Sequence, residues 1–144
     1  MIIDYPFETT RVAANLILNG VMERHRDIPF ILSHAGGTLP FLAHRIAVFD
    51  KKTQLQDNYP DGALAYMKRF YFDTALSGDK VPLDALSGIV DPSHILFGSD
   101  YPYISEDVVA TETAGFDAYA GFDEANFAAI NRGNAENLFS RFSG

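Results

Sequence analysis

Short apolar runs alternate with helix-like patterns along this chain. Three runs rich in β-branched and aromatic residues predict buried strands at positions 30–33, 70–73 and 95–98. Apolar residues at helical spacing predict helices at 10–24, 40–50, 61–69, 83–90 and 105–119, and two helical pieces within 123–142. Asp123 and Asn134 are the expected N-caps of these two pieces, and Gly133 is the expected stop between them. Such alternation predicts parallel strands joined by right-handed crossovers, which is an α/β fold.

Polar residues follow each predicted strand directly. The three strand ends are Ser33-His34, Asp73-Thr74 and Ser99-Asp100. Because ligands of parallel α/β proteins bind at the carboxyl ends of the strands, these ends are the informative positions. A parallel sheet would bring His34, Asp73 and Asp100 to one edge although they are distant in sequence, and this convergence is the main indication of a functional site.

His34 runs into a turn of small residues, Ala35, Gly36 and Gly37, which leave room for a ligand beside the imidazole. An imidazole titrates near neutral pH, so it can transfer protons or bind a divalent metal as the neutral ring. The alternative is a structural histidine that is hydrogen-bonded to a neighbouring strand. The position of His34 at a strand end favours the functional role.

Asp100 comes between an apolar strand and the sequence Tyr101-Pro102. A carboxylate in apolar surroundings needs a cation, hydrogen-bond donors or a proton. Asp100 therefore either binds a metal or caps the loop by accepting backbone N–H groups, and the sequence leaves both open. Asp73, followed by Thr74 and small residues, is typical of a structural hydrogen-bonding role.

Composition narrows the classes of function. With 144 residues, 47% of them hydrophobic, the chain can bury a core, and residues 1–144 are expected to form a single domain. The formal net charge of −8 argues against binding to nucleic acid or to a membrane surface. The absence of cysteine excludes disulfides and thiolate ligands, so histidine and carboxylates remain as metal ligands. No stretch of the sequence resembles a signal peptide or a membrane span, and a cytoplasmic location is expected.

Several sequence blocks, taken together and in order, resemble the amidohydrolase-related superfamily. The blocks are DYPFETTR at 4–11, ILSHAGGTLP at 31–40 with Arg45-Ile46 following, FYFDTALSG at 70–78, ILFGSDYPY at 95–103, and Gly133-Asn134-Ala135 with Leu138-Phe139. Within the superfamily, the chain is most similar to the branch of aminocarboxymuconate semialdehyde decarboxylase and the aromatic-acid decarboxylases, including methylsalicylate-type decarboxylases. The resemblance implies a distorted (β/α)₈ barrel, the TIM-barrel fold of metal-dependent hydrolases, with one divalent metal, zinc or manganese, at the carboxyl ends of its strands.

The same resemblance implies roles for three residues. His34 matches the histidine that serves as catalytic acid and base beside the metal. Asp100 matches the aspartate of the last strand, which binds the metal or lies against it. Arg45 matches an arginine that holds a substrate carboxylate, in some cases in a neighbouring subunit, and the planar guanidinium suits such a bidentate contact.

One departure from the family pattern changes the expectation for this chain. The H-x-H metal pair that ends the first strand of the family occurs nowhere in this sequence. A complete barrel needs about 200 residues or more, whereas this chain offers three clear strands and a fourth cut short at 1–3. The chain therefore looks like the C-terminal part of such an enzyme. Two sheet edges and an inward face are expected to be open, which favours a homo-oligomer or completion by a missing N-terminal half.

The expected function is metal-dependent decarboxylation of a small aromatic or enoic carboxylic acid. His34 would transfer the proton, Asp100 would bind or orient the metal, and Arg45 would hold a carboxylate. Two alternatives stay open, which are metal-dependent hydrolysis of an amide, lactone or ester, and a non-catalytic fragment or subunit that acts by association. Metal binding by this chain alone is expected to be weak or absent, since one carboxylate and one imidazole hold zinc poorly.

Overall fold

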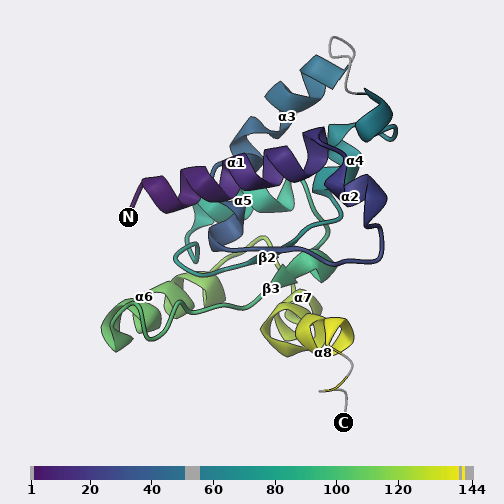
Figure 1. Cartoon of the computed structure of the whole chain (residues 1–144). Helices are drawn as coiled ribbons and strands as arrows, with labels where there is room; N and C mark the ends of the chain where they lie inside the picture. The colour runs from purple at the N-terminus through teal and green to yellow at the C-terminus, as the bar shows by residue number, and fades with distance from the viewer. Residues whose placement is uncertain (1, 51–55, 140, 142–144) are drawn as a thin grey trace.

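The computed structural model of the protein describes residues 2–50, 56–139 and 141 (Figure 1). In chain order the elements are α1 (Asp4–Leu18), α2 (Val21–Arg24), β1 (Ile31–Leu32), η1 (His34–Gly36), α3 (Leu39–Phe49), η3 (Gln56–Asn58), α4 (Ala63–Met67), β2 (Tyr71–Asp73), α5 (Lys80–Ser87), η4 (Pro92–His94), β3 (Ile95–Leu96), α6 (Glu106–Asp117), α7 (Glu124–Ala128), η5 (Ala129–Gly133) and α8 (Asn134–Leu138). The α labels mark α-helices, η5 is a π-helical turn, and the other η labels mark short 3₁₀ helices.

All three predicted strands are present and pair in parallel in the order β1-β2-β3, which confirms the α/β prediction. Each is shorter than predicted: β1 and β2 begin one residue later than expected, β1 ends before Ser33, and β3 ends before Phe97. The register places Leu32 beside Phe72 and Phe72 beside Ile95. All three of these side chains are buried in the hydrophobic core, so this row anchors the sheet against the helices.

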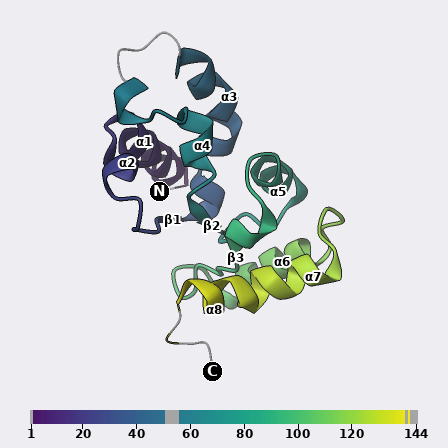
Figure 2. The ribbon, with the colours of Figure 1, turned by 90° about the vertical axis from the view of Figure 1, so that its right-hand side faces the viewer.

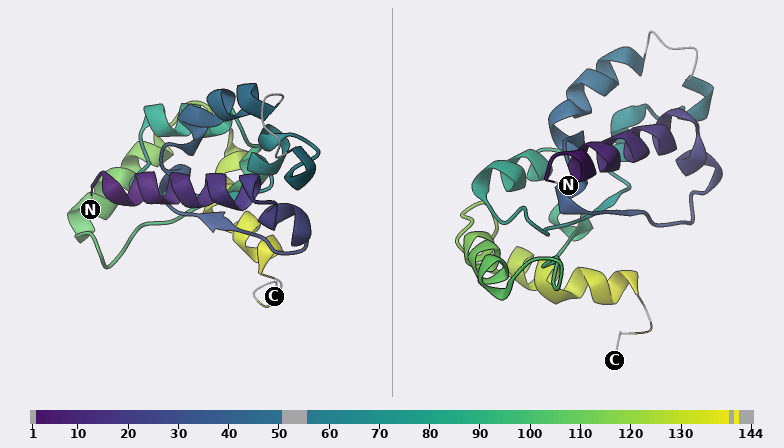
Figure 3. Two further views of the ribbon diagram at one scale, coloured as in Figure 1. Left: turned by 45° about the horizontal axis from the view of Figure 1, so that its top comes forward. Right: turned by 60° about the vertical axis from the view of Figure 1, so that its left-hand side comes forward.

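Most of the helices lie near the two edge strands of this small sheet. Helices α1 to α4 lie toward β1, and α6 to α8 lie beside β3 (Figure 2). Helix α1 runs alongside β1 (Figure 3). Within the described part of the chain, no helix has the length and apolar character needed to cross a membrane.

The first helix differs from the prediction at both ends. It begins at Asp4, since Pro6 lies in its first turn, where the missing N–H of proline would have no partner in any case. Ile2 is in a turn and Ile3 is the N-cap of α1, so the strand expected at 1–3 is wrong for these two residues, while Met1 lies outside the described residues. The predicted continuous helix also breaks at Gly20, whose φ of 69° is left-handed.

Of the three helix boundaries predicted in the C-terminal region, the structure confirms the N-cap at Asp123 and contradicts the other two. The Asp123 carboxylate accepts the backbone N–H of Asn126, as an N-cap should. Gly133 does not end the helix, because its φ of −58° is helical and the chain passes through η5 into α8. Asn134 is not an N-cap. Its side chain instead donates to two backbone carbonyls, at 2.8 Å from Pro92 O and 2.7 Å from Ile95 O.

These contacts change the expected picture of the sheet edges. Asn134 covers a carbonyl of β3, and the backbone N–H of Phe97 donates to Ile130 O in η5 at 3.0 Å, so the C-terminal helices partly cover the β3 edge. Strand β1 has no second strand partner among the described residues. Ile31 on this edge is 42% exposed, which leaves an apolar edge open where two had been expected.

Replacing Asn134 by alanine is expected to lower the free energy of unfolding by about 2–3 kcal/mol. Asn134 is 6% exposed, and its removal would take the side-chain donor from the buried Ile95 carbonyl and one of two donors from the Pro92 carbonyl, which also accepts the N–H of Ile95. Chemical denaturation measures the loss. The matched control is Asn15→Ala on the exposed face of α1, which is expected to change stability by less than about 0.5 kcal/mol. Equal effects of the two substitutions would contradict this account of the β3 edge.

Candidate active site

His34 lies in a strained turn directly after β1. His34 and Ala35 have φ angles of 55° and 51°, which lie in the left-handed region. That conformation costs roughly 1–2 kcal/mol for each residue with a side chain. Gly37 continues the turn at φ 64°, and a Cβ there would lie 2.1 Å from Pro6 O of α1. The turn is therefore pressed against α1, and the surrounding packing holds the backbone in a conformation that it would not adopt by itself.

The imidazole of His34 has one engaged and one available nitrogen. Nδ1 lies 3.1 Å from the backbone carbonyl oxygen of Ala75. A carbonyl oxygen only accepts, so Nδ1 carries the hydrogen and the neutral ring has its lone pair on Nε2. Nε2 has no hydrogen-bond partner among the described residues and is not among their buried unpaired atoms, so it is accessible. This arrangement suits a group that accepts or delivers a proton at Nε2.

Asp73 is the last residue of β2, and its carboxylate is hydrogen-bonded to the backbone of the His34 turn. Its Oδ1 accepts the backbone N–H of His34 at 2.8 Å and that of Ala75 at 3.1 Å. The predicted hydrogen-bonding role is therefore what the structure shows. Burial raises the pKa of the Asp73 carboxyl above its usual value, the two N–H bonds oppose this rise, and the negative charge of Asp100 adds to it.

Asp100 follows β3 in a left-handed turn with φ 59°. Its backbone carbonyl closes the turn by accepting the N–H of Tyr103 at 2.9 Å. Its half-buried carboxylate makes no hydrogen bond or ion pair with the residues that the structure describes. The carboxylate therefore does not cap the loop, which is one of the two interpretations of the sequence, and it is left available to a cation.

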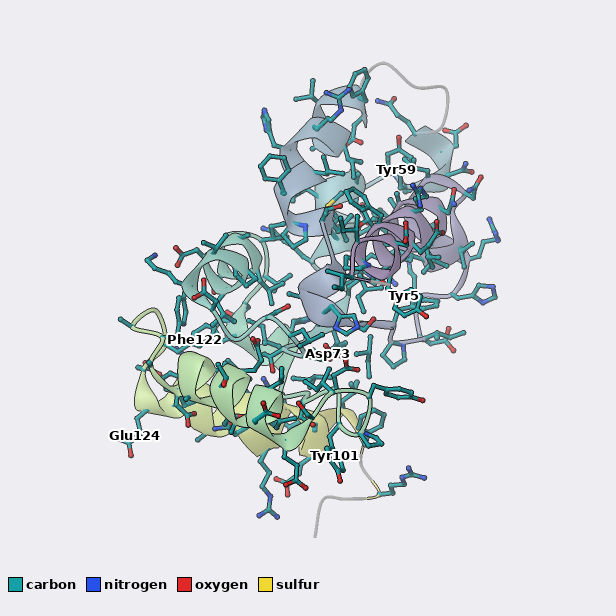
Figure 4. All side chains as sticks on the ribbon, turned by 90° about the vertical axis from the view of Figure 1, so that its left-hand side faces the viewer. Tyr5, Tyr59, Asp73, Tyr101, Phe122 and Glu124 are labelled. Carbon is teal, nitrogen blue, oxygen red and sulfur yellow. The ribbon has the colours of Figure 1, made fainter. Side chains whose placement is uncertain are left out.

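The structure gathers His34, Asp73 and Asp100 at neighbouring strand ends, and Arg45 makes no hydrogen bond or ion pair with these three residues. Asp73 Oδ1 accepts the backbone N–H of His34 at 2.8 Å, and the negative charge of Asp100 adds to the rise in the pKa of the Asp73 carboxyl. Figure 4 shows Asp73 between Tyr5 of α1 and Tyr101, the residue after Asp100. Arg45 is exposed on α3, with its guanidinium carbon 5.9 Å from the centre of the Phe49 ring.

An open pocket of about 430 Å³ borders His34 along the free edge of β1. Helix α1 forms its other wall, and the lining residues are Tyr5, Glu8, Thr9, Val12, Ile31, Leu32, Ser33 and His34. No residue of this wall could be given a role from the sequence alone. The signal was present in the block at 4–11, which supported the family resemblance but suggested no role for any single residue.

The described residues offer some of the ligands that a divalent metal ion needs. Asp100 offers an unpaired carboxylate and His34 an accessible imidazole nitrogen, both of them suitable donors. Among the described residues, however, no group of three or more histidine or acidic side chains is close enough to hold a metal ion. These residues do not form a complete metal site, and any further ligands have to come from outside them.

A parallel sheet with an imidazole and two carboxylates at its strand ends is the arrangement of a metal-dependent hydrolase-type barrel. The family model described as Amidohydrolase matches residues 3–141, and the chain belongs to this family. Its fold corresponds to part of the TIM barrel of these enzymes, as the resemblance implied. Among the described residues, β1 has no second strand partner, as expected of a sheet that forms part of a barrel.

Two curated relatives and one solved structure describe the family members that the chain is similar to. The 6-methylsalicylic acid decarboxylase acuB of Aspergillus aculeatus is 42% identical over 96% of this chain and 43% of its own length. The 6-methylsalicylic acid decarboxylase of Penicillium expansum is 37% identical over 98% of this chain and 44% of its own length. The dihydroxybenzoic acid decarboxylase of Polaromonas sp. JS666, with bound manganese, superposes with a TM-score of 0.78 at 26% identity over 94% of this chain and 40% of its own. The chain thus spans less than half the length of these relatives.

Proposed function

We propose that this chain belongs to a metal-dependent decarboxylase of a small aromatic carboxylic acid. The observation that carries the proposal is the accessible Nε2 of His34, whose backbone is bonded to the Asp73 carboxylate, at the edge where such sheets bind ligands. Its relatives support the substrate class, because two of them are named for 6-methylsalicylic acid.

His34 would supply the proton that the reaction requires. Decarboxylation of an aromatic acid adds a proton to the ring carbon that carries the carboxylate. The bond to the carboxyl carbon then breaks, its electron pair returns to the ring, and carbon dioxide leaves. The Nδ1–H bond to Ala75 O would keep the ring oriented. Nε2 would first take up a proton from water and then deliver it to the ring carbon, which returns His34 to its neutral form.

A divalent ion would bind at Asp100 together with ligands from outside the described residues. When bound, such an ion polarises the acid and neutralises part of its charge. Zinc and manganese both accept carboxylate and imidazole ligands, and the manganese in the dihydroxybenzoic acid decarboxylase favours manganese. In this chain, Asp100 would hold the ion and His34 would remain free to transfer the proton.

Arg45 would act in a homo-oligomer rather than within its own site. Its guanidinium lies on the exposed face of α3 and makes no ion pair with the described residues, so a substrate carboxylate bound in a neighbouring subunit is the partner that suits it. The open apolar edge of β1 also favours association with further polypeptide. The absence of cysteine and the acidic composition suit a cytoplasmic protein.

The proposal is tested by measuring carbon dioxide release from 6-methylsalicylate and dihydroxybenzoates. The complete protein, supplied with Mn²⁺ or Zn²⁺, is expected to release carbon dioxide from at least one of these acids. Removal of the metal with a chelator is expected to lower the rate at least tenfold, and Mn²⁺ to restore it. Hydrolysis of amide, lactone or ester substrates without carbon dioxide release would replace the proposal by the hydrolase alternative. Inactivity towards both substrate classes, with metal bound, would favour a non-catalytic role.

A further inference from the structure

Asp73 connects β2, the His34 turn and the segment after β2 through one carboxylate oxygen. It is the last residue of β2, and one of its oxygens receives N–H groups from both the His34 turn and the segment after β2. The carboxylate therefore ties the backbone of residue 34 to the backbone of residue 75. Charge-assisted hydrogen bonds of this kind are stronger than neutral ones, so the tie is well suited to fixing a geometry.

The tie to the His34 backbone acts on the strained part of the turn. His34 has a φ of 55°, and its N–H points to Asp73 Oδ1 at 2.8 Å. His34 lies beyond the paired residues of β1, and its N–H donates to the Asp73 carboxylate instead of to the sheet. Without it, the left-handed backbone of His34 would lose a specific bond that holds it in place.

The tie to Ala75 acts on the imidazole. Oδ1 of Asp73 accepts the N–H of Ala75 at 3.1 Å, and the carbonyl of the same residue accepts Nδ1–H of His34 at 3.1 Å. The Ser77 hydroxyl donates to that carbonyl as well, at 3.2 Å. Asp73 thus sets the position of the acceptor that decides which nitrogen of His34 carries the hydrogen.

Close packing keeps the carboxylate in this position. A Cβ on Gly98, in the segment after β3, would lie 3.0 Å from Cβ of Asp73 and 3.2 Å from its Cγ. The glycine lets the β3 end approach the Asp73 side chain directly. In addition, Thr74 exchanges hydrogen bonds with the N–H and carbonyl of Gly98, at 3.1 and 3.3 Å, which locks the two strand ends together.

We propose that Asp73 is a positioning residue for His34, which it orients through two backbone N–H groups so that Nδ1 is protonated and Nε2 is available for proton transfer. The inference deepens the proposed decarboxylation and rests on it for the role of Nε2. Asp73 itself touches neither substrate nor metal in this account. Its contribution lies in the geometry and the tautomer of His34.

Two conservative substitutions in the complete protein separate geometry from charge. Asp73→Asn keeps a side-chain oxygen that can accept both N–H groups but removes the charge. Asp73→Glu keeps the charge but moves the oxygens by the length of one methylene group. We expect Asp73→Asn to keep kcat within about tenfold of the wild type, and Asp73→Glu to lower kcat by about 10²-fold with little change in KM, since a displacement of about 1 Å costs that much. The reverse order would overturn the proposal and assign a charge role to Asp73.

The ¹⁵N chemical shifts of the His34 ring supply a readout that does not depend on turnover. Wild type and Asp73→Asn are expected to show a protonated Nδ1 and an unprotonated Nε2 in the neutral ring, whereas Asp73→Glu is expected to show exchange between the two tautomers. Unchanged shifts in Asp73→Glu would overturn the positioning role. If the shifts behave as expected while the wild type releases no carbon dioxide from any aromatic acid, the proposed function fails and the positioning role stands.

Discussion

Replacing His34 by asparagine is expected to lower kcat for carbon dioxide release by about 10²–10⁴-fold with little change in KM. Asparagine tolerates the left-handed backbone at φ 55° better than most residues. Its side-chain NH₂ can also replace Nδ1–H as a donor to Ala75 O. What it lacks is any group at the place of Nε2. The substitution therefore removes proton transfer while it preserves the turn.

The control for this variant is His25→Asn, which changes an exposed histidine after α2 that borders no part of the site. We expect its kcat to equal that of the wild type. Steady-state rates, together with near-ultraviolet circular dichroism of both variants, measure the effect and check the fold. If His34→Asn keeps more than a tenth of the wild-type kcat, His34 is not the proton donor. The accessible carboxylate of Asp100 would then be the next group to test.

The sheet could be predicted because its signal is local and strong. Each strand is a short apolar run between polar residues, and the alternation of strands with helices requires parallel pairing. The helix ends were harder. Gly20 breaks the first predicted helix because the turn needs its left-handed φ, whereas Gly133 stays helical because Asn134 bonds to carbonyls far away in sequence. Nothing in the local sequence of either glycine distinguishes these outcomes, which depend on tertiary contacts.

The chemically active residues at the strand ends could be predicted from the sequence, but the contacts between them could not. His34 and Asp100 could be singled out because a polar residue directly after a buried parallel strand lies where ligands bind. The link that Asp73 makes between the His34 turn and Ala75 could not, since it depends on side-chain geometry across two strands. The exposed position of Arg45 is also a tertiary fact, because the spacing from His34 does not tell which face of α3 it occupies.

Gly37→Ala is expected to be the most destabilising single methyl addition in the His34 turn, with a loss of about 2–5 kcal/mol in the free energy of unfolding. Two effects add. An alanine at φ 64° costs roughly 1–2 kcal/mol for the left-handed backbone. Its Cβ would also lie 2.1 Å from Pro6 O and 2.8 Å from Pro6 C, so either α1 or the turn has to move, at about 1–3 kcal/mol. A loss of this size is a large share of the roughly 5–15 kcal/mol that stabilises a typical domain.

Gly88→Ala is the matched control, because it adds the same methyl group at an ordinary helical φ of −69°. There a Cβ would lie 3.4 Å from Asp84 O, which is normal contact, so the change is expected to be neutral or stabilising by up to about 1 kcal/mol. Urea denaturation of both variants measures the difference. If Gly37→Ala lowers the free energy of unfolding by less than about 1 kcal/mol, then α1 shifts to make room for the added methyl group. The contact between Pro6 and Gly37 would then not be what holds the His34 backbone in its left-handed conformation, and Asp73 would have to hold it alone.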